Sequence, residues 1–203
     1  NILMQAAYTF YIFGLNLILA TFSDQAVTVL GLYYKWQAFF FIPLGAMQTC
    51  IVPVVSYNYA AGKYERCKKT LKVAIIFGIA LMMIGVVLFE TIPGPMLHVF
   101  SHDPKVISIG EVAFRFIGIS FIPLVSSLTF PVFFQALGHA VKSSILTIIR
   151  TVFLFIPLAY LFSRFGLNYF WLTFPVTDSI TTLAGYLFYR QFVKKTMPKT
   201  IME

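Results

Sequence analysis

Long apolar segments separated by short polar connections dominate this sequence. Each of six segments is about as long as the 20 residues that a helix needs to cross roughly 30 Å of hydrocarbon. They are approximately residues 2–22, 30–60, 71–92, 107–137, 141–162 and 169–193. We therefore predict an all-α integral membrane protein, in which residues 1–203 form a single bundle of six transmembrane helices.

The composition agrees with a location in the lipid bilayer. Hydrophobic residues make up 59% of the chain and charged residues 11%, and its mean hydropathy is +0.85, whereas soluble domains carry about 25% charged residues. A net charge of +8 would favour nucleic acid as the partner of a soluble protein. Here the cations lie in the connections and at the C-terminus, so membrane topology explains them and no nucleic-acid partner is expected.

The distribution of these cations predicts an orientation. One side of the bundle receives Lys63, Arg66, Lys68, Lys69, Lys72, Lys142, Arg190, Lys194, Lys195 and Lys199. Cytoplasmic connections are rich in Lys and Arg, so this side is predicted to be cytoplasmic, with both ends of a multi-pass chain inside the plasma (inner) membrane. The rings of Tyr33, Trp36 and Trp171 are expected near the outer interface. Cys50 falls in a segment and Cys67 in the basic connection, so both are expected to be free thiols.

Three stretches, in order and with consistent spacing, carry a resemblance to a known family. They are residues 53–69 (PVVSYNYAAGKYERCKK), 134–144 (FQALGHAVKSS) and 171–178 (WLTFPVTD). They resemble the C-terminal six-helix lobe of the multidrug and toxic compound extrusion (MATE) transporters. The resemblance implies one half of a twelve-helix antiporter, a fragment whose partner is a missing N-terminal six-helix lobe or a second copy. It also implies export of small organic cations and amphipathic drugs or metabolites in exchange for H⁺ or Na⁺, with no cofactor.

The sequence also departs from the family pattern. Ala60 and Ala61 stand where the family commonly has a glycine. The first segment lacks the acid that some members carry in this lobe, and Gln5 and Asn16 are its only strongly polar side chains. The coupling ion is therefore left open between H⁺ and Na⁺.

Two charges are predicted to lie deep in the membrane. Arg150 and Asp178 are each about 13 Å from the end of their segments, where an unpaired charge costs at least about 2.5 kcal/mol. Arg150 shares a helical face with Ser143 and Thr147, and Asp178 shares one with Thr181. Polar faces on consecutive antiparallel helices should meet. The pair is either a fixed bridge that holds the helices together or part of an ion-coupling network.

Other polar side chains are candidates for lining a central cleft. They are Gln5, Asn16, Lys35, Gln48, Asn58, Gln135 and Thr181. Alternatively, the amides only join helices by hydrogen bonds, and Lys35 extends outward to the interface. Glu111 and Arg115 have the i,i+4 spacing of an ion pair near the outer surface.

Three function classes compete with drug export for a chain of this kind. An enzyme would need titratable groups that converge at one site, but His98, His102 and Asp103 share a surface connection without the spacing of a metal site. We therefore expect neither catalytic residues nor a metal. A lipid-linked oligosaccharide flippase of the same broader fold and a membrane protein that does not transport remain as alternatives.

Overall fold

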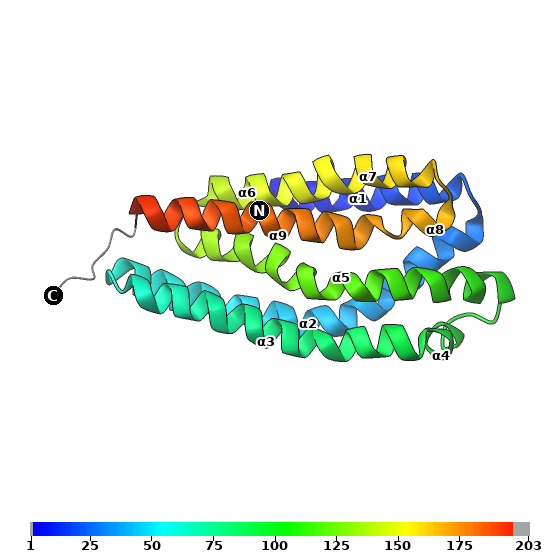
Figure 1. The fold of residues 1–203 in the computed structure, drawn as a ribbon, viewed down its shortest axis with the longest axis horizontal. Helices are drawn as coiled ribbons and strands as arrows, with labels where there is room; N and C mark the ends of the chain where they lie inside the picture. The colour runs from blue at the N-terminus through cyan, green and yellow to red at the C-terminus, as the bar shows by residue number, and fades with distance from the viewer. Residues whose placement is uncertain (1, 197–203) are drawn as a thin grey trace.

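The computed structural model describes residues 2–196, and residues 1 and 197–203 lie outside this description. All regular structure in the described part is helical (Figure 1), which confirms the all-α class. The elements are α1 (Ile2–Ala20), α2 (Asp24–Ala60), α3 (Tyr64–Thr91), α4 (Pro93–His98), α5 (Pro104–Ala136), α6 (Ala140–Ile148), η1 (Ile149–Phe155), α7 (Ile156–Ser163), α8 (Leu167–Phe170) and α9 (Thr173–Thr196). Because α6, η1 and α7 follow one another without a break, they form one rod over Ala140–Ser163.

Within residues 2–196, 4 helices are long and apolar enough to cross a membrane, namely α2, α3, α5 and the α6–α7 rod. The expected count of six crossing helices is therefore not confirmed. The apolar part of α1 that can be described, Gln5–Ala20, is shorter than a span. The last helix, α9, is long enough, but Asp178, Arg190 and several threonines lower its mean hydropathy.

Local capping sets helix starts that hydropathy does not locate. The second helix begins at Asp24, ahead of residue 30, because Ser23 Oγ accepts a hydrogen bond from the Ala26 amide at 3.1 Å. Similarly, α5 begins at Pro104 because Asp103 Oδ1 accepts from the Lys105 amide at 2.9 Å. The last helix, α9, starts later than residue 169 because the short α8 precedes it.

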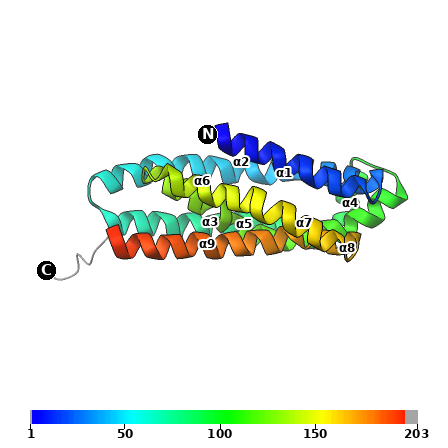
Figure 2. The same cartoon turned by 90° about the horizontal axis from the view of Figure 1, so that it is seen from above.

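The central element is α5, which packs against α2, α3 and α9. Figure 1 shows α1, the α6–α7 rod and α9 on one side of it, and α3 with most of α2 on the other. In the turned view of Figure 2 the rod crosses obliquely between α1 and α9. In the 18-residue apolar stretch of α5 that could cross a membrane, 61% is buried inside the protein, against 17% of the corresponding stretch of α2. The core therefore lies along α5.

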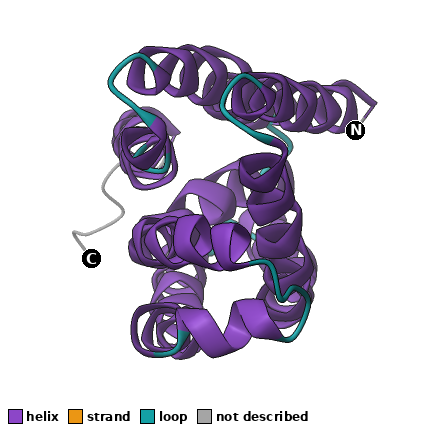
Figure 3. Cartoon of the chain, turned by 90° about the vertical axis from the view of Figure 1, so that its right-hand side faces the viewer, coloured by secondary structure: helices purple, strands orange, loops and turns teal. Residues whose placement is uncertain are grey.

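The two ends of the bundle differ in charge. One end carries the turn at residues 61–63, the turn at 137–139 and the end of α9 (Figures 1 and 2). The cations expected on one side gather there, apart from Lys199, which lies outside the described residues. The other end carries α4 and α8 and faces the viewer in Figure 3. The grouping of charge agrees with the expected topology, while the identity of the cytoplasmic side stays a prediction.

Some of the aromatic residues expected at the membrane interface are buried between helices. Tyr33 and Trp171 are buried, and Tyr33 contacts Phe174 with ring centroids 5.4 Å apart. Trp36 is half-buried and donates a hydrogen bond from Nε1 to the Met96 carbonyl at 3.0 Å. Aromatic rings near a helix end therefore serve here to join helices.

Candidate functional site: a buried ion pair beside a cavity

Arg150 and Asp178 form an ion pair between η1 and α9. Arg150 Nε donates a hydrogen bond to Asp178 Oδ1 at 2.8 Å. The two residues are only 5% and 1% exposed. The polar faces predicted on these helices thus meet in the structure. Because both charged side chains are buried, each depends on the other and on nearby polar atoms.

The carboxylate of Asp178 is incompletely hydrogen-bonded. Ser127 Oγ of α5 lies 2.9 Å from Asp178 Oδ1 and also 2.9 Å from the Leu124 carbonyl. A hydroxyl has one hydrogen to donate, so these two bonds are alternatives. The second carboxylate oxygen, Oδ2, is buried and has no hydrogen-bond partner among the described residues. This oxygen can accept a proton or contact a small cation.

Aromatic rings surround the cationic side of the pair. The Phe155 ring centroid lies 5.0 Å from Arg150 Cζ, within cation–π distance. Tyr11 of α1 stacks on Phe155 at 4.9 Å, and Phe174 of α9 meets Phe155 edge-on at 5.3 Å. These rings exclude water and lower the local dielectric, which strengthens the attraction between the two charges.

A π-helical segment and a proline set the local path of the rod at Arg150. Residues Ile149–Phe155 form η1, and Pro157 follows at the start of α7. Proline has no N–H and its ring crowds the carbonyl of Phe153, so a regular α-helix cannot pass through this point. A π-helical turn is one way in which a helix accommodates such an interruption.

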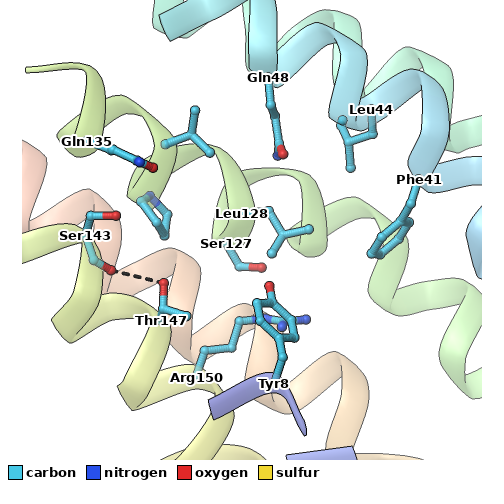
Figure 4. A pocket seen from close by; sticks show the side chains of 13 residues that line it. Tyr8, Phe41, Leu44, Gln48, Ser127, Leu128, Gln135, Ser143, Thr147 and Arg150 are labelled. Atoms are coloured by element: carbon cyan, nitrogen blue, oxygen red, sulfur yellow. Dashed lines mark hydrogen bonds between the residues drawn. The ribbon is translucent and has the colours of Figure 1, made fainter. Parts of the chain in front are cut away.

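A cavity of about 280 Å³ lies next to Arg150. Figure 4 shows Gln48 and Gln135 pointing toward it from α2 and α5, with Thr147 and Arg150 on the opposite wall. The hydroxyl of Thr147 donates to the Ser143 carbonyl at 3.1 Å (Figure 4). Among the described residues, Arg150 is the one charged side chain that lines the cavity. The cavity wall is therefore largely apolar, with a few hydrogen-bonding groups and one cation.

The structure brings only some of the predicted cleft residues to this cavity. Gln48 and Gln135 line it, and Thr181 is buried on α9, where its hydroxyl donates to the Thr177 carbonyl at 2.8 Å. Lys35 is exposed, and its Nζ lies 4.9 Å from the Phe100 ring centroid, away from the cavity.

The remaining amides lie elsewhere. Asn58 donates to the Val54 carbonyl at 2.8 Å and lines a groove near the basic end. Asn16 donates to the Ile12 carbonyl at 2.9 Å, and the backbone carbonyl of Gln5 accepts from Thr9 at 3.1 Å. Both bonds lie within α1. Whether any of these residues serves transport stays a prediction.

Two polar residues that line the cavity were not predicted. Ser127 is one of two adjacent serines in a largely apolar stretch of α5, and Tyr8 lies in the largely apolar α1. The serine pair was a usable signal, since hydroxyls in a membrane helix commonly bond to another helix. The tyrosine gave none, because Tyr8 is one of 11 tyrosines in the chain.

Among the described residues, the ion pair predicted at the surface is not formed, whereas the two cysteines are free as predicted. No ion pair within 4.0 Å joins Glu111 and Arg115 in the described chain, although their spacing predicted one. Both are exposed, where ordering two long side chains costs about as much as the pair gains. Cys50 and Cys67 are free thiols, as expected. Residues 2–196 contain no cluster of three metal-ligating side chains.

The fold and this site together define a bundle of long apolar helices that is built around a buried ion pair. The sequence model of the MatE family matches residues 1–161, and the chain belongs to this family. MATE transporters are membrane proteins, in agreement with the apolar helices found here.

Three similar proteins are longer than this chain. The chain is 24% identical over 170 residues to an FAD transporter of Shewanella oneidensis, covering 83% of this chain and 38% of that protein. It is 22% identical over 173 residues to the multidrug export protein MepA of Staphylococcus saprophyticus, covering 85% and 38%.

A solved structure described as the outward-facing conformation of a multidrug resistance MATE family transporter of the MOP superfamily superposes with a TM-score of 0.91 at 20% identity. The match covers 98% of this chain and 45% of that one. The structural similarity shows the fold. The chain spans less than half the length of these relatives.

Proposed function

We propose that this chain is one lobe of a secondary active transporter that exports amphipathic organic compounds in exchange for H⁺ or Na⁺. The observation that carries the proposal is the buried, half-satisfied carboxylate of Asp178, whose partner Arg150 lines a cavity together with Gln48 and Gln135. Ionisable groups inside a membrane bundle are costly and typically mark ion or substrate pathways. Membership of the MatE family supports transport as the activity and gives no support to an enzymatic role.

A second bundle completes the transporter in this proposal. Alternating access requires two bundles that move about a site between them. The cavity at Arg150 is lined on this lobe by α1, α2, α5, α6 and η1, and the opposite wall would come from an N-terminal six-helix lobe or a second copy. The basic end would face the cytoplasm, with the transporter in the plasma membrane.

Asp178 is the proposed coupling residue. Protonation at Oδ2, or a Na⁺ ion there, would weaken its attraction for Arg150. The π-helical segment η1 would then change the position of Arg150 at the cavity wall. Binding of the ion and of the substrate would be coupled through this one side chain.

Cationic and amphipathic drugs or metabolites are the proposed substrates. The relatives include a multidrug export protein and an FAD transporter, so both drugs and a large anionic metabolite occur among their cargoes. Acidic groups that favour organic cations would have to come from the second bundle. Among the described residues of this lobe, the one charged side chain that lines the cavity is the cation Arg150. The oligosaccharide flippase is not favoured by these relatives.

Proteoliposomes that contain the complete transporter test the proposal. A pH or Na⁺ gradient is expected to drive efflux of a fluorescent organic cation or of FAD, and collapse of the gradient with an ionophore should stop it. Transport that ignores both gradients would contradict ion exchange. Translocation of a lipid-linked sugar, but of neither solute, would favour the flippase.

A further inference from the structure

A groove of about 670 Å³ runs between α2 and α3, apart from the cavity at Arg150. The side chains that line it recur at intervals of three or four positions, so they form one stripe on each helix. The stripes include Met47, Ile51 and Asn58 on α2, and Arg66, Lys69 and Phe77 on α3. Several of the apolar members are open to the surroundings, with Val73 55% exposed and Phe77 59% exposed.

The groove is polar at one end and apolar along the rest of its length. Asn58, Arg66 and Lys69 lie nearest the turn that joins α2 to α3, whereas Met47 and Phe77 lie deepest. From Arg66 to Phe77 the helix advances about 16 Å. This is about half of the roughly 30 Å hydrocarbon thickness. The groove thus has the depth of one membrane leaflet and the polarity of a lipid molecule.

The two cations at the head of the groove lack an acidic partner. In the described chain no carboxylate lies within 4.0 Å of Arg66 or Lys69, and the neighbouring Glu65 is paired with Lys68 at 2.6 Å. Basic pockets between membrane helices on the cytoplasmic side attract the headgroups of anionic lipids. The predicted orientation places this end of α3 at that leaflet.

We propose that this groove is a binding site for an anionic phospholipid. The headgroup phosphate pairs with Arg66 and Lys69, and an acyl chain lies along Val73 and Phe77 toward Met47. A zwitterionic lipid fits less well, because its own cation would meet the two basic side chains. This site needs only a chain that crosses a membrane, so it stands independently of the proposed transport activity.

Native mass spectrometry of the complete transporter, delipidated in mild detergent, tests the headgroup contact. Phosphatidylglycerol is expected to bind more tightly than phosphatidylcholine. The Arg66→Gln/Lys69→Gln variant should bind phosphatidylglycerol about 25-fold more weakly, since each basic residue contributes roughly a factor of five near an anionic surface. Lys63→Gln/Lys72→Gln makes the same charge change outside the groove and should bind as the wild type does. Equal binding by the two double variants would overturn the proposal.

Alkylation of Cys50 identifies what occupies the groove. Its thiol is exposed and lines the groove, whereas the thiol of Cys67 is buried. Phosphatidylglycerol should slow the reaction of N-ethylmaleimide with the peptide that contains Cys50, and inorganic phosphate or phosphatidylcholine should not. Val73→Trp fills the groove while keeping both cations, and should abolish this protection by lipid. Protection that persists after delipidation would mean that protein covers the groove, and protection by phosphate alone would mean a simple anion site. Either result would overturn a lipid site.

Discussion

Arg150 and Asp178 share a single hydrogen bond, from Nε to Oδ1 at 2.8 Å, while the other carboxylate oxygen has no partner among the described residues. A bidentate pair would use both oxygens and hold the two helices more rigidly. With one bond, either partner can be released while the other keeps contacts, Arg150 to Phe155 and Asp178 to Ser127. The geometry is suited to a pair that opens.

Removing one member of the pair should destabilise the bundle. Asp178→Asn leaves the Arg150 cation buried without its counter-charge, and is expected to lower the free energy of unfolding by about 3 to 5 kcal/mol. The measurement is denaturant unfolding of the complete transporter in detergent. Arg150→Met/Asp178→Leu removes both charges and should cost much less. Asp24→Asn changes an exposed aspartate and should stay within about 0.5 kcal/mol of wild type.

The double variant also tests ion coupling. If Asp178 carries the coupling ion, Arg150→Met/Asp178→Leu should fold and carry substrate down its own gradient, but should lose the response to pH or Na⁺. The measurement is substrate efflux from proteoliposomes with and without each ion gradient. Unchanged coupling in a folded double variant would remove Asp178 from the transport mechanism and leave it a packing role.

Ser127 is expected to contribute through its bond to Asp178. Ser127→Ala removes a hydroxyl at 2.9 Å from a buried carboxylate and should destabilise the protein by about 1.5 to 3 kcal/mol, the range for hydrogen bonds to charged groups. Ser126→Ala is the matched control, because Ser126 is also buried but has no recorded side-chain bond to another described residue. Unfolding free energies of the two variants should differ by this amount, and equal values would show that Ser127 donates to Leu124 instead.

The deep charges were predictable because an apolar sequence makes them conspicuous. Arg150 and Asp178 interrupt apolar segments at matching depths on consecutive helices, and the cost of an unpaired charge in lipid leaves pairing as the economical solution. The same logic found Gln48 and Gln135, which line the cavity.

Which face of each helix is buried could not be predicted in the same way. A soluble helix shows its core face by hydrophobic periodicity, but a membrane helix is apolar toward both core and lipid. For this reason the sequence did not predict that the rings of Tyr33 and Trp171 are buried between helices. Lys35, a cleft candidate, lies at the surface beside Phe100. The predicted six spans are not confirmed at α1, whose described apolar part is short, or at α9, where a buried polar site lowers the hydropathy that marks a span.

His139 should give the stability of the protein a dependence on pH. It lies in the turn between α5 and α6, outside the predicted spans. Burial first, and then the charge of Lys142, lower the pKa of its imidazole below 6.5. The unfolded chain, with a histidine pKa of about 6.5, therefore binds the proton more readily. Stability should fall as the pH drops from about 6.5 through the folded-state pKa.

Substitution isolates this contribution. In thermal unfolding of the complete transporter, His139→Gln should flatten the fall in melting temperature below about pH 6.5. Lys142→Gln removes the neighbouring charge and should reduce the effect in part. Identical pH profiles for wild type and His139→Gln would show that other groups control acid stability.

Close packing of α5 against α9 should depend on Gly185. A Cβ at this position would lie 2.6 Å from Phe130 Cδ2 and 2.9 Å from its Cβ, so the aromatic ring and the helix that carries it would have to shift. Gly185→Ala is therefore expected to destabilise the bundle by about 1 to 3 kcal/mol, the cost of overpacking, although alanine is the better helix former. Gly31→Ala, also within a helix but with nothing within 4 Å of the new Cβ, should be neutral or stabilising. Because α9 carries Asp178, a shift of this helix should also alter ion-driven efflux in Gly185→Ala but not in Gly31→Ala. Equal stability of the two variants would show that α9 can move away from α5 at little cost.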